Sequence, residues 1–434
     1  MKLVTPLPAE DAVADNPHPD RASGNWEIEL SSWPRKLCAI LLILGVSGVL
    51  LYHTWGTFLA AWITRSKTPD PAIYELAIHY DPTNADYHFV LAEIYNNSTQ
   101  YLNPVRAKQE YEAAVRYNPY RSEHWVALSK IYEQEGDVER SRYAMTKALE
   151  NDPNYALRHW AAANLYVRLG DQKAADFEMR RAADLDVNYT VQVLDLVWAL
   201  YGDPDVIMAT HVPNTREANL IALAYFMARQ SPRGAELAWS RLKAFETKPQ
   251  ERFPYIDYLI GLKQPQQAWE VFAAGLADKD TSGNPPFYNG NFDSEPLNGG
   301  FDWRYSTSDD AEVRRDTTTV KSGMASLLVT FSGKQNPNYG DVWHYLPLEK
   351  GKNYVLKFWM KTDAISTNEG MYVTVDGKSS EKQVGTTYWQ EFSLPFTASS
   401  DLVRVVLRRD PSQKFDNLLK GKVWLDGFTV TAVP

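Results

Sequence analysis

The 434-residue chain has a single cysteine, Cys38, which excludes an intramolecular disulfide and any zinc site built from cysteines. It also lacks a surplus of basic residues. The chain has 45 Lys and Arg and 54 Asp and Glu, which gives a formal net charge of −9. This balance argues against a nucleic-acid-binding protein, which needs a basic face to displace counterions from phosphates. Hydrophobic residues (44%) and charged residues (23%) are near globular averages, so the chain as a whole is not predicted to be disordered.

The motifs that mark common catalytic sites are also missing. The sequence has no G-x-S-x-G, P-loop, H-E-x-x-H or G-x-G-x-x-G. Its histidines are scattered, and nothing marks the placed pair of carboxylates that a glycosidase needs. We therefore expect a protein that is not an enzyme, and a cryptic glycan-modifying enzyme is kept as an alternative.

One stretch, from Leu37 to Ile63, contains no charged residue. As a helix its 27 residues would be about 40 Å long, which exceeds the roughly 30 Å hydrocarbon core of a bilayer. The sequence therefore predicts a transmembrane helix over residues 37–64. A cleaved signal peptide is disfavoured because a long polar tail, residues 1–36, precedes the apolar run.

The tail is rich in Pro, Ala, Asp and Asn, which predicts disorder. It carries four basic residues, whereas only Arg65 and Lys67 follow the span before Arg106. Since cytoplasmic flanks are enriched in Lys and Arg, we expect a single-pass membrane protein. Its N-terminus would be cytoplasmic and its bulk exported, periplasmic or extracellular.

Residues 68–277 predict an array of helical repeats. Pro119 and Pro153, like Tyr132 and Tyr166, are 34 residues apart, a period typical of helix-turn-helix solenoids. The clearest copy resembles the tetratricopeptide repeat (TPR), with signature positions filled by Trp125, Leu128, Tyr132, Ser141, Met145, Ala148 and Pro153. We expect four to six degenerate helical pairs in a right-handed superhelix.

The TPR resemblance implies a concave groove, lined by the first helix of each pair, that binds a protein partner. The residues at groove positions are Asp86, Phe89, Glu93, Asn96, Glu123, Val126, Lys130, Glu133, Leu157, Trp160, Asn164 and Val167. Phe89 and Trp160 are the expected anchors, since buried aromatic residues often dominate interfaces. The alternative is that these two residues only cover neighbouring helices.

The C-terminal part predicts an all-β domain. Residues 278–286 have the composition of a linker, and residues 287–434 contain short alternating runs at 354–360, 371–375, 402–407 and 423–430. Such runs favour a two-sheet sandwich. The predicted fold class is thus multidomain α plus all-β: one transmembrane helix, a TPR-like α-solenoid and a C-terminal β-sandwich.

Several segments of the β region resemble the jelly-roll, galactose-binding-like carbohydrate-binding modules attached to xylanases and cellulases. They are, in order, 289–293, 321–327, 350–361 and 423–428. The resemblance implies a structural calcium ion at Asp293 and Asp426, with backbone carbonyls completing an oxygen shell. The family usually has Glu where Asp293 stands. The alternative role for both residues is turn capping.

Alternation along the strands predicts candidate glycan-binding residues. Trp359, Tyr372, Arg404 and Arg408 fall opposite the apolar positions, so we expect one sheet to present all four on its polar face. Alternatively, the aromatic residues lie under Lys and Arg stems on an ordinary outer surface. Residues 285–434 hold 17 basic and 18 acidic residues, which favours stacking on neutral sugars over capture of charged polymers.

The combination resembles TPR proteins of bacterial surface-polysaccharide systems. We therefore expect a non-catalytic, membrane-anchored scaffold of the bacterial envelope, whose solenoid binds a protein and whose jelly roll binds a polysaccharide during assembly or export. The alternative is a purely protein-binding assembly factor for a membrane or secretion complex, with the jelly roll as a structural cap. Neither function involves nucleic acid.

Overall fold

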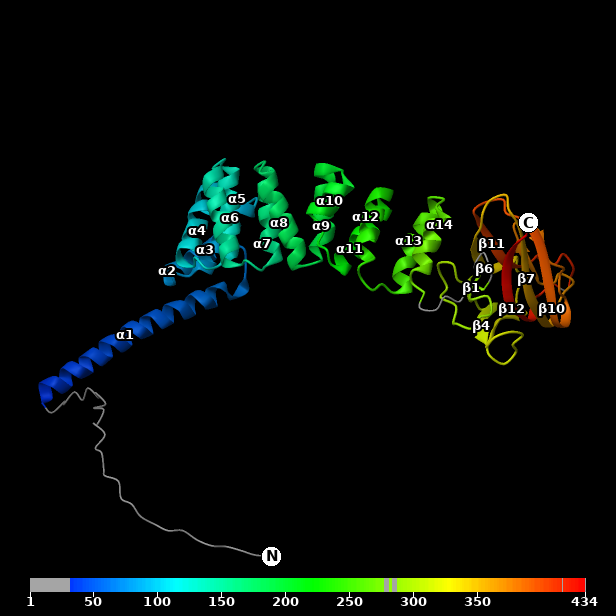
Figure 1. Cartoon of the computed structure of the whole chain (residues 1–434). Coiled ribbons are helices and arrows are strands. Elements are labelled where there is room, and N and C mark those ends of the chain that lie inside the picture. Colours follow the sequence, from blue (N-terminus) through cyan, green and yellow to red (C-terminus); the bar gives the residue numbers. More distant parts are fainter. Residues whose placement is uncertain (1–31, 277–280, 283–286, 416, 434) are drawn as a thin grey trace, which may run out of the picture. The chain divides into compact units, whose positions relative to one another are not determined.

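The computed structural model describes residues 32–276, 281–282, 287–415 and 417–433 (Figure 1). The chain divides into two compact units, Met1–Asn151 and Asp152–Pro434. The predicted tail lies outside the described residues up to position 31. The predicted linker also lies outside them, apart from 281–282, which form strand β1 (Thr281–Ser282).

Helix α1 (Trp33–Ile63), continued by the short helix η1 (Thr64–Ser66), is long and apolar enough to cross a membrane. A signal sequence near the N-terminus would share these properties. The last turns of α1 contact α2 (Pro71–Tyr80). There Ala60 is fully buried, and a Cβ on Gly56 would come within 2.7 Å of the Tyr80 carbonyl oxygen, so the small residues allow close helix packing.

The remaining helices form a solenoid of antiparallel pairs. In the first unit these are α3 (Ala85–Asn97) with α4 (Pro104–Tyr117), and α5 (Ser122–Gln134) with α6 (Val138–Asn151). The second unit contains α7 (Ala156–Arg168), α8 (Gln172–Leu185), α9 (Tyr189–Tyr201), α10 (Pro204–Thr210), α11 (Arg216–Ala228), α12 (Pro232–Leu242), α13 (Pro249–Gly261) and α14 (Pro265–Ala273).

The TPR signature residues form the core of these pairs, which confirms the predicted repeat. Leu128, Met145 and Ala148 are buried between α5 and α6. Ser129 and Ser141 each donate a hydroxyl hydrogen bond to the other's carbonyl at 2.9 Å, so the two helices lie close together. Gly136 begins the turn between them with φ +77°, a conformation that glycine adopts without strain.

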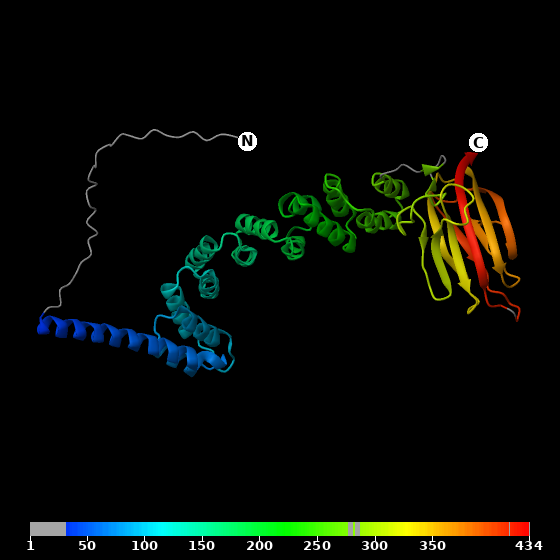
Figure 2. The same ribbon diagram turned by 90° about the horizontal axis from the view of Figure 1, so that it is seen from below.

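The C-terminal domain is a sandwich of two antiparallel five-stranded sheets (Figure 2). The β7 sheet has the order β10-β7-β12-β5-β4, with bounds Gly385–Thr397, Asn353–Ile365, Lys420–Val433, Ser326–Ser332 and Ala311–Asp316. The β6 sheet has the order β3-β6-β11-β8-β9, with bounds Arg304–Tyr305, Tyr339–Pro347, Leu402–Arg409, Tyr372–Val375 and Lys378–Ser379. Strand β2 (Phe287–Tyr288) pairs with β1.

The core lies between the two sheets and follows the predicted alternation. Leu356, Phe358 and Met360 of β7 are fully buried, while Trp359 on the same strand points outward and is half-buried. Aromatic rings fill the centre, where Phe428 stacks on Phe358 with ring centres 5.1 Å apart. The predicted all-β sandwich is therefore confirmed.

Within the second unit, the last helix pair packs on the sandwich through aromatic side chains. Phe272 contacts Tyr288 edge to face at 5.2 Å, and Trp269 contacts the fully buried Phe301 at 5.4 Å. A Cβ on Gly300 would lie 2.5 Å from the Phe272 ring, so only glycine permits this approach. This junction places α13 and α14 beside strands β3 and β6.

Candidate functional site

The outer face of the β6 sheet carries a group of aromatic and cationic side chains. Trp343 and Tyr345 point outward from β6, with ring centres 4.7 Å apart. The guanidinium carbons of Arg304 and Arg404 lie 4.9 and 4.4 Å from the centre of the Trp343 ring. Arg304 also pairs with Asp257 of α13, with Nη2 and Oδ1 2.5 Å apart. This group, which we call the Trp343 cluster, contains two cations and one carboxylate.

The outer face of the β7 sheet also presents a tryptophan, but in a different setting. The Lys321 ammonium group lies 4.0 Å from the centre of the Trp359 ring. The cross-strand neighbours of Trp359 are two acidic residues, Asp426 of β12 and Glu391 of β10. Trp359 thus lies between carboxylates under one lysine, whereas Trp343 lies between arginines.

The structure corrects the expectation that one sheet presents all four predicted glycan-binding residues. Arg404 and Arg408 lie outward on β11, and Tyr372 lies on the neighbouring β8. Trp359 belongs to the other sheet, because β7 pairs with β10 and β12. Three of the four candidates therefore share a face, and Trp359 does not.

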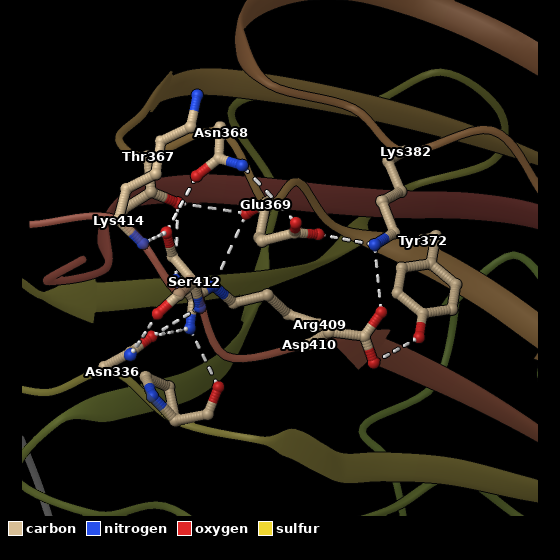
Figure 3. A network of polar contacts seen from close by, with 11 residues as sticks. Asn336, Thr367, Asn368, Glu369, Tyr372, Lys382, Arg409, Asp410, Ser412 and Lys414 are labelled. Atoms are coloured by element: carbon tan, nitrogen blue, oxygen red, sulfur yellow. Dashed lines mark hydrogen bonds and ion pairs between the residues drawn. The ribbon is translucent and has the colours of Figure 1, made fainter. Parts of the chain in front are cut away.

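Tyr372 is only 9% exposed and is held by charged neighbours (Figure 3). Its hydroxyl donates to Asp410 at 2.8 Å, and Lys382 bridges Asp410 and Glu369 at 2.9 and 2.5 Å. These carboxylates raise the pKa of Lys382 to about 12, and Lys382 in turn lowers the pKa of Asp410. The Lys382 ammonium group also lies 5.4 Å from the Tyr372 ring centre, so little of that ring is open to a ligand.

Next to this network, Arg409 is fully buried without a carboxylate partner in the part of the chain that the structure describes (Figure 3). Its guanidinium group donates instead to neutral oxygens of three loops: side-chain oxygens of Asn336 and Thr367, and backbone carbonyl oxygens of Pro337, Glu369 and Asn417. Burial lowers the pKa of Arg409. Because every contact is to a loop, we assign Arg409 to holding the loops at the end of β11 and not to ligand binding.

In the solenoid, the predicted groove residues lie on the first helices of three pairs, α3, α5 and α7. Phe89 is half-buried and stacks on His124, with ring centres 4.7 Å apart. Trp160 lies 6.1 Å from Tyr189 and is also half-buried. Val126 is buried, with 7% of its surface exposed, so it contributes to the core of its repeat.

The polar groove candidates are engaged by neighbouring helices. Asp86 accepts a hydrogen bond from Arg121 at 3.0 Å, and Glu93 accepts one from the Tyr111 hydroxyl. Leu157, Glu123 and Lys130 are exposed, while Asn96, Glu133, Asn164 and Val167 are partly exposed. A partner could therefore reach most of these positions.

Two further repeat residues, His88 and His159, were not predicted. Each ring lies between a glutamate and a proline carbonyl: His159 Nδ1 is 2.5 Å from Glu178, and its Nε2 is 3.0 Å from the Pro153 oxygen. Burial alone would lower the pKa of His159, but these hydrogen bonds raise it. Two acceptors require two ring protons, so the imidazolium form is favoured.

Family comparisons agree with this architecture. The tetratricopeptide repeat family model matches residues 123–155, and a family model described as a carbohydrate binding domain matches residues 284–409. The chain combines tetratricopeptide repeats with a carbohydrate-binding domain. The search of curated proteins found no match.

Solved structures similar to each part differ widely in sequence. The CBM22-1 xylan-binding domain of Paenibacillus barcinonensis Xyn10C is 16% identical, covers 33% of this chain and 91% of its own, and has a TM-score of 0.24. A crystal structure of MamA protein is 12% identical over 44% of this chain and 90% of its own, with a TM-score of 0.28. Pseudomonas aeruginosa pilF is 12% identical over 52% and 90%, with a TM-score of 0.27.

The predicted calcium site of the carbohydrate-binding domain does not fit the side chains found there. Asp426 is fully buried, and its carboxylate accepts four hydrogen bonds, from Lys321 N, Ser322 N, Ser322 Oγ and Gly427 N, at 2.7 to 3.1 Å. A carboxylate has about four lone-pair positions, so none is left for a cation. Burial raises the pKa of Asp426, although these hydrogen bonds oppose the shift.

Groups beside Asp293 also accept hydrogen bonds from within the domain. Arg315 donates to the carbonyl oxygens of Phe292 and Asp293 at 2.7 and 2.8 Å. The Asp293 carboxylate accepts from Met324 N at 2.5 Å. In the ranges that the structure describes, no group of three or more His, Cys, Asp or Glu could hold a metal ion. Hydrogen bonds to segment 321–324 thus join Asp293 and Asp426.

Sequence reasoning missed the residues at the centre of the Trp343 cluster, because strand β6 was not predicted. The signal was present: from Asp341 to Leu346, residues alternate outward and inward, with Val342, His344 and Leu346 buried. His344 obscured the pattern, since a histidine rarely occupies a core position. Here burial lowers its pKa to about 3, so it is neutral and stacks on Phe287 with ring centres 4.2 Å apart.

Proposed function

We propose that the chain is a non-catalytic, membrane-anchored scaffold of the bacterial cell envelope. Its TPR helices would bind a protein partner, and its carbohydrate-binding domain would bind a polysaccharide during assembly or export. TPR repeats suggest a protein-interaction scaffold, and the second domain suggests carbohydrate binding. The observation that carries the proposal is the Trp343 cluster, which gives the carbohydrate-binding domain an aromatic and polar outer face.

The anchoring part of the proposal rests on helix α1. Its apolar surface is exposed along the span, which suits a lipid environment. The basic residues before the span favour a cytoplasmic N-terminus and an exported bulk. The test is fractionation of cells that express the full chain with a tag at either end. We expect the chain in the membrane fraction, with only the C-terminal tag open to external protease. A cleaved, soluble product would contradict the anchor.

Glycan binding is tested by affinity electrophoresis of the detergent-solubilised full chain in gels that contain neutral or acidic polysaccharides. We expect retardation by at least one polymer, and loss of that retardation in Trp343→Ala. Trp359→Ala, the matched substitution on the other sheet, should migrate like the wild type. If no polysaccharide slows the migration of the wild-type chain, glycan binding is contradicted.

Partner binding is tested by pull-down from envelope extracts with the full chain as bait. Trp160→Ala should lose proteins that the wild type retains, because a half-buried aromatic residue can anchor a partner. Phe177→Ala removes a more exposed ring (65%) from a second helix and is the control. An unchanged set of retained proteins in Trp160→Ala and Phe89→Ala would contradict the groove assignment.

A second candidate function is a purely protein-binding assembly factor, with the sandwich as a structural cap. One observation favours it: a cation lies over the ring of Trp343, Trp359 and Tyr372 alike. At an exposed site each such contact contributes about 0.5–1 kcal/mol, which a stacking sugar would have to displace. Retained partners together with no glycan binding would favour this function.

A further inference from the structure

Two guanidinium groups converge on one indole ring in the Trp343 cluster. Arg304 comes from β3 and Arg404 from β11, the two strands that flank β6, and both lie within 5 Å of the Trp343 ring centre. Asp257 neutralises Arg304. Arg404 is exposed, and no carboxylate of the described chain lies within ion-pair distance of it. The cluster therefore has an unneutralised positive charge beside an aromatic surface.

The other acidic groups on this sheet do not neutralise Arg404. Asp410 is engaged by Tyr372 and Lys382 at the β8 end of the face. Asp341 points outward two residues before Trp343, but β6 and β11 are antiparallel, so it lies towards Arg408. Tyr345, the residue directly opposite Arg404, is uncharged. The positive charge of Arg404 beside the Trp343 ring is therefore not neutralised by these groups.

On the basis of the proposed glycan binding, we infer that the Trp343 cluster selects acidic polysaccharides, with Arg404 binding the carboxylate of a uronic acid. A guanidinium group matches a carboxylate in a planar, two-point hydrogen bond. The sugar ring would then lie on the edge of Trp343 and on Tyr345. A neutral sugar offers Arg404 no charge to pair with and must displace it from the indole, whereas a uronic acid forms a charge-assisted pair with it.

The Trp359 face provides the internal contrast. Trp359 has Asp426 and Glu391 as cross-strand neighbours and a single lysine over its ring. Glu391 places a carboxylate directly beside this ring, although Lys357 and Lys361 also lie outward on the same strand. The two faces therefore differ in the groups directly beside the tryptophan: an unpaired guanidinium group at Trp343, and a carboxylate and an ammonium group at Trp359.

The experiment compares polyuronates with their methyl esters, which have the same sugar backbone without the charge. The detergent-solubilised full chain is titrated with polygalacturonate, alginate and the esterified form of each. We expect the acidic form of at least one polymer to bind about tenfold or more tightly than its ester. Raising NaCl from about 50 to about 500 mM should weaken the binding of the acidic form and leave the binding of the ester unchanged, because salt screens exposed charges.

The variants assign the preference to the cluster. Arg404→Gln should reduce the affinity for the acidic polymer about tenfold, to that of the ester, and leave the ester unchanged. Arg404→Lys should keep part of the preference, since it keeps the charge but not the planar fork. Lys321→Gln removes the cation over Trp359 and should change neither affinity. Arg404 is exposed, and thermal unfolding of each variant checks that the fold is retained.

The outcomes separate this inference from the function on which it rests. Equal binding of acid and ester, a preference that survives Arg404→Gln, or binding to neutral xylan but to no polyuronate would overturn the selection of acidic polysaccharides and leave glycan binding standing. If the chain binds none of these polymers, charged or neutral, glycan binding itself fails.

Discussion

The two outer faces of the carbohydrate-binding domain each present a tryptophan, on strands with the same alternating pattern. Trp343 lies between arginines and beside the helices of the solenoid, while Trp359 lies between Asp426 and Glu391 on a face where Lys321 covers the ring. Alternation along a strand determines which side chains point outward. Cross-strand neighbours, which come from distant parts of the chain, determine what the outward residue can bind.

The first way to sharpen the comparison is to remove the contact that joins the Trp343 face to the helices. Phe301→Ala should lower the free energy of unfolding by about 3–5 kcal/mol, because Phe301 is fully buried against Trp269 and Phe272. Chemical denaturation of the full chain measures the change. Phe415→Ala, at a fully exposed position, is the control and should have no effect. A loss below about 1 kcal/mol would show that the junction does not support this face.

A second prediction concerns the loop that leads into β3. Burial raises the pKa of Asp302 to about 7, against the backbone hydrogen bonds from Leu297 and Trp303. Its unfolded pKa is about 3.9, so the folded state holds the proton more tightly. The free energy of unfolding should therefore fall as the pH rises from about 4 through about 7, by at most about 4 kcal/mol.

Denaturation at about pH 5 and about pH 8 measures this slope. Asp302→Asn should remove most of the decrease, whereas Asp309→Asn, at an exposed position nearby, should retain it. The same pH dependence in wild type and Asp302→Asn would contradict the assignment. The buried carboxyl beside the other face, Asp426, also has a raised pKa, so it adds a decrease of the same sign that Asp302→Asn leaves in place.

The third prediction concerns the segment whose Lys321 covers Trp359. Asp426→Asn should lower the free energy of unfolding by about 1–3 kcal/mol, because the partly buried backbone N–H groups of Lys321 and Ser322 lose a charged acceptor. Glycan binding on the opposite sheet should not change. Calcium or a chelator should leave the unfolding temperature of the wild type unchanged, since the lone pairs of Asp426 are taken. A rise in the unfolding temperature with calcium would contradict this prediction and support the calcium site that the sequence predicts.

Much of the fold could be predicted because its signals are local. Helical spacing placed Leu128, Met145 and Ala148 in the repeat core, and alternation placed Phe358 and Met360 in the sandwich core. The calcium prediction came from a motif resemblance, which carries no information on Arg315 or on the four donors around Asp426.

The site was harder to predict because it depends on pairing between distant strands. Trp359 was assigned to the wrong sheet, since β7 pairs with β12 some sixty residues later, and period-two alternation says nothing about partners. Arg304 lies in a two-residue strand, too short to show any pattern. Only the folded chain brings Arg304 and Arg404 to the two sides of β6.

The comparison of the two faces is tested most directly by measuring polysaccharide affinity for the full chain with Trp343→Ala and with Trp359→Ala. The account predicts a loss of at least about tenfold, roughly 1.4 kcal/mol, in Trp343→Ala and no change in Trp359→Ala. Equal affinities in both variants and the wild type, or a loss confined to Trp359→Ala, would contradict it.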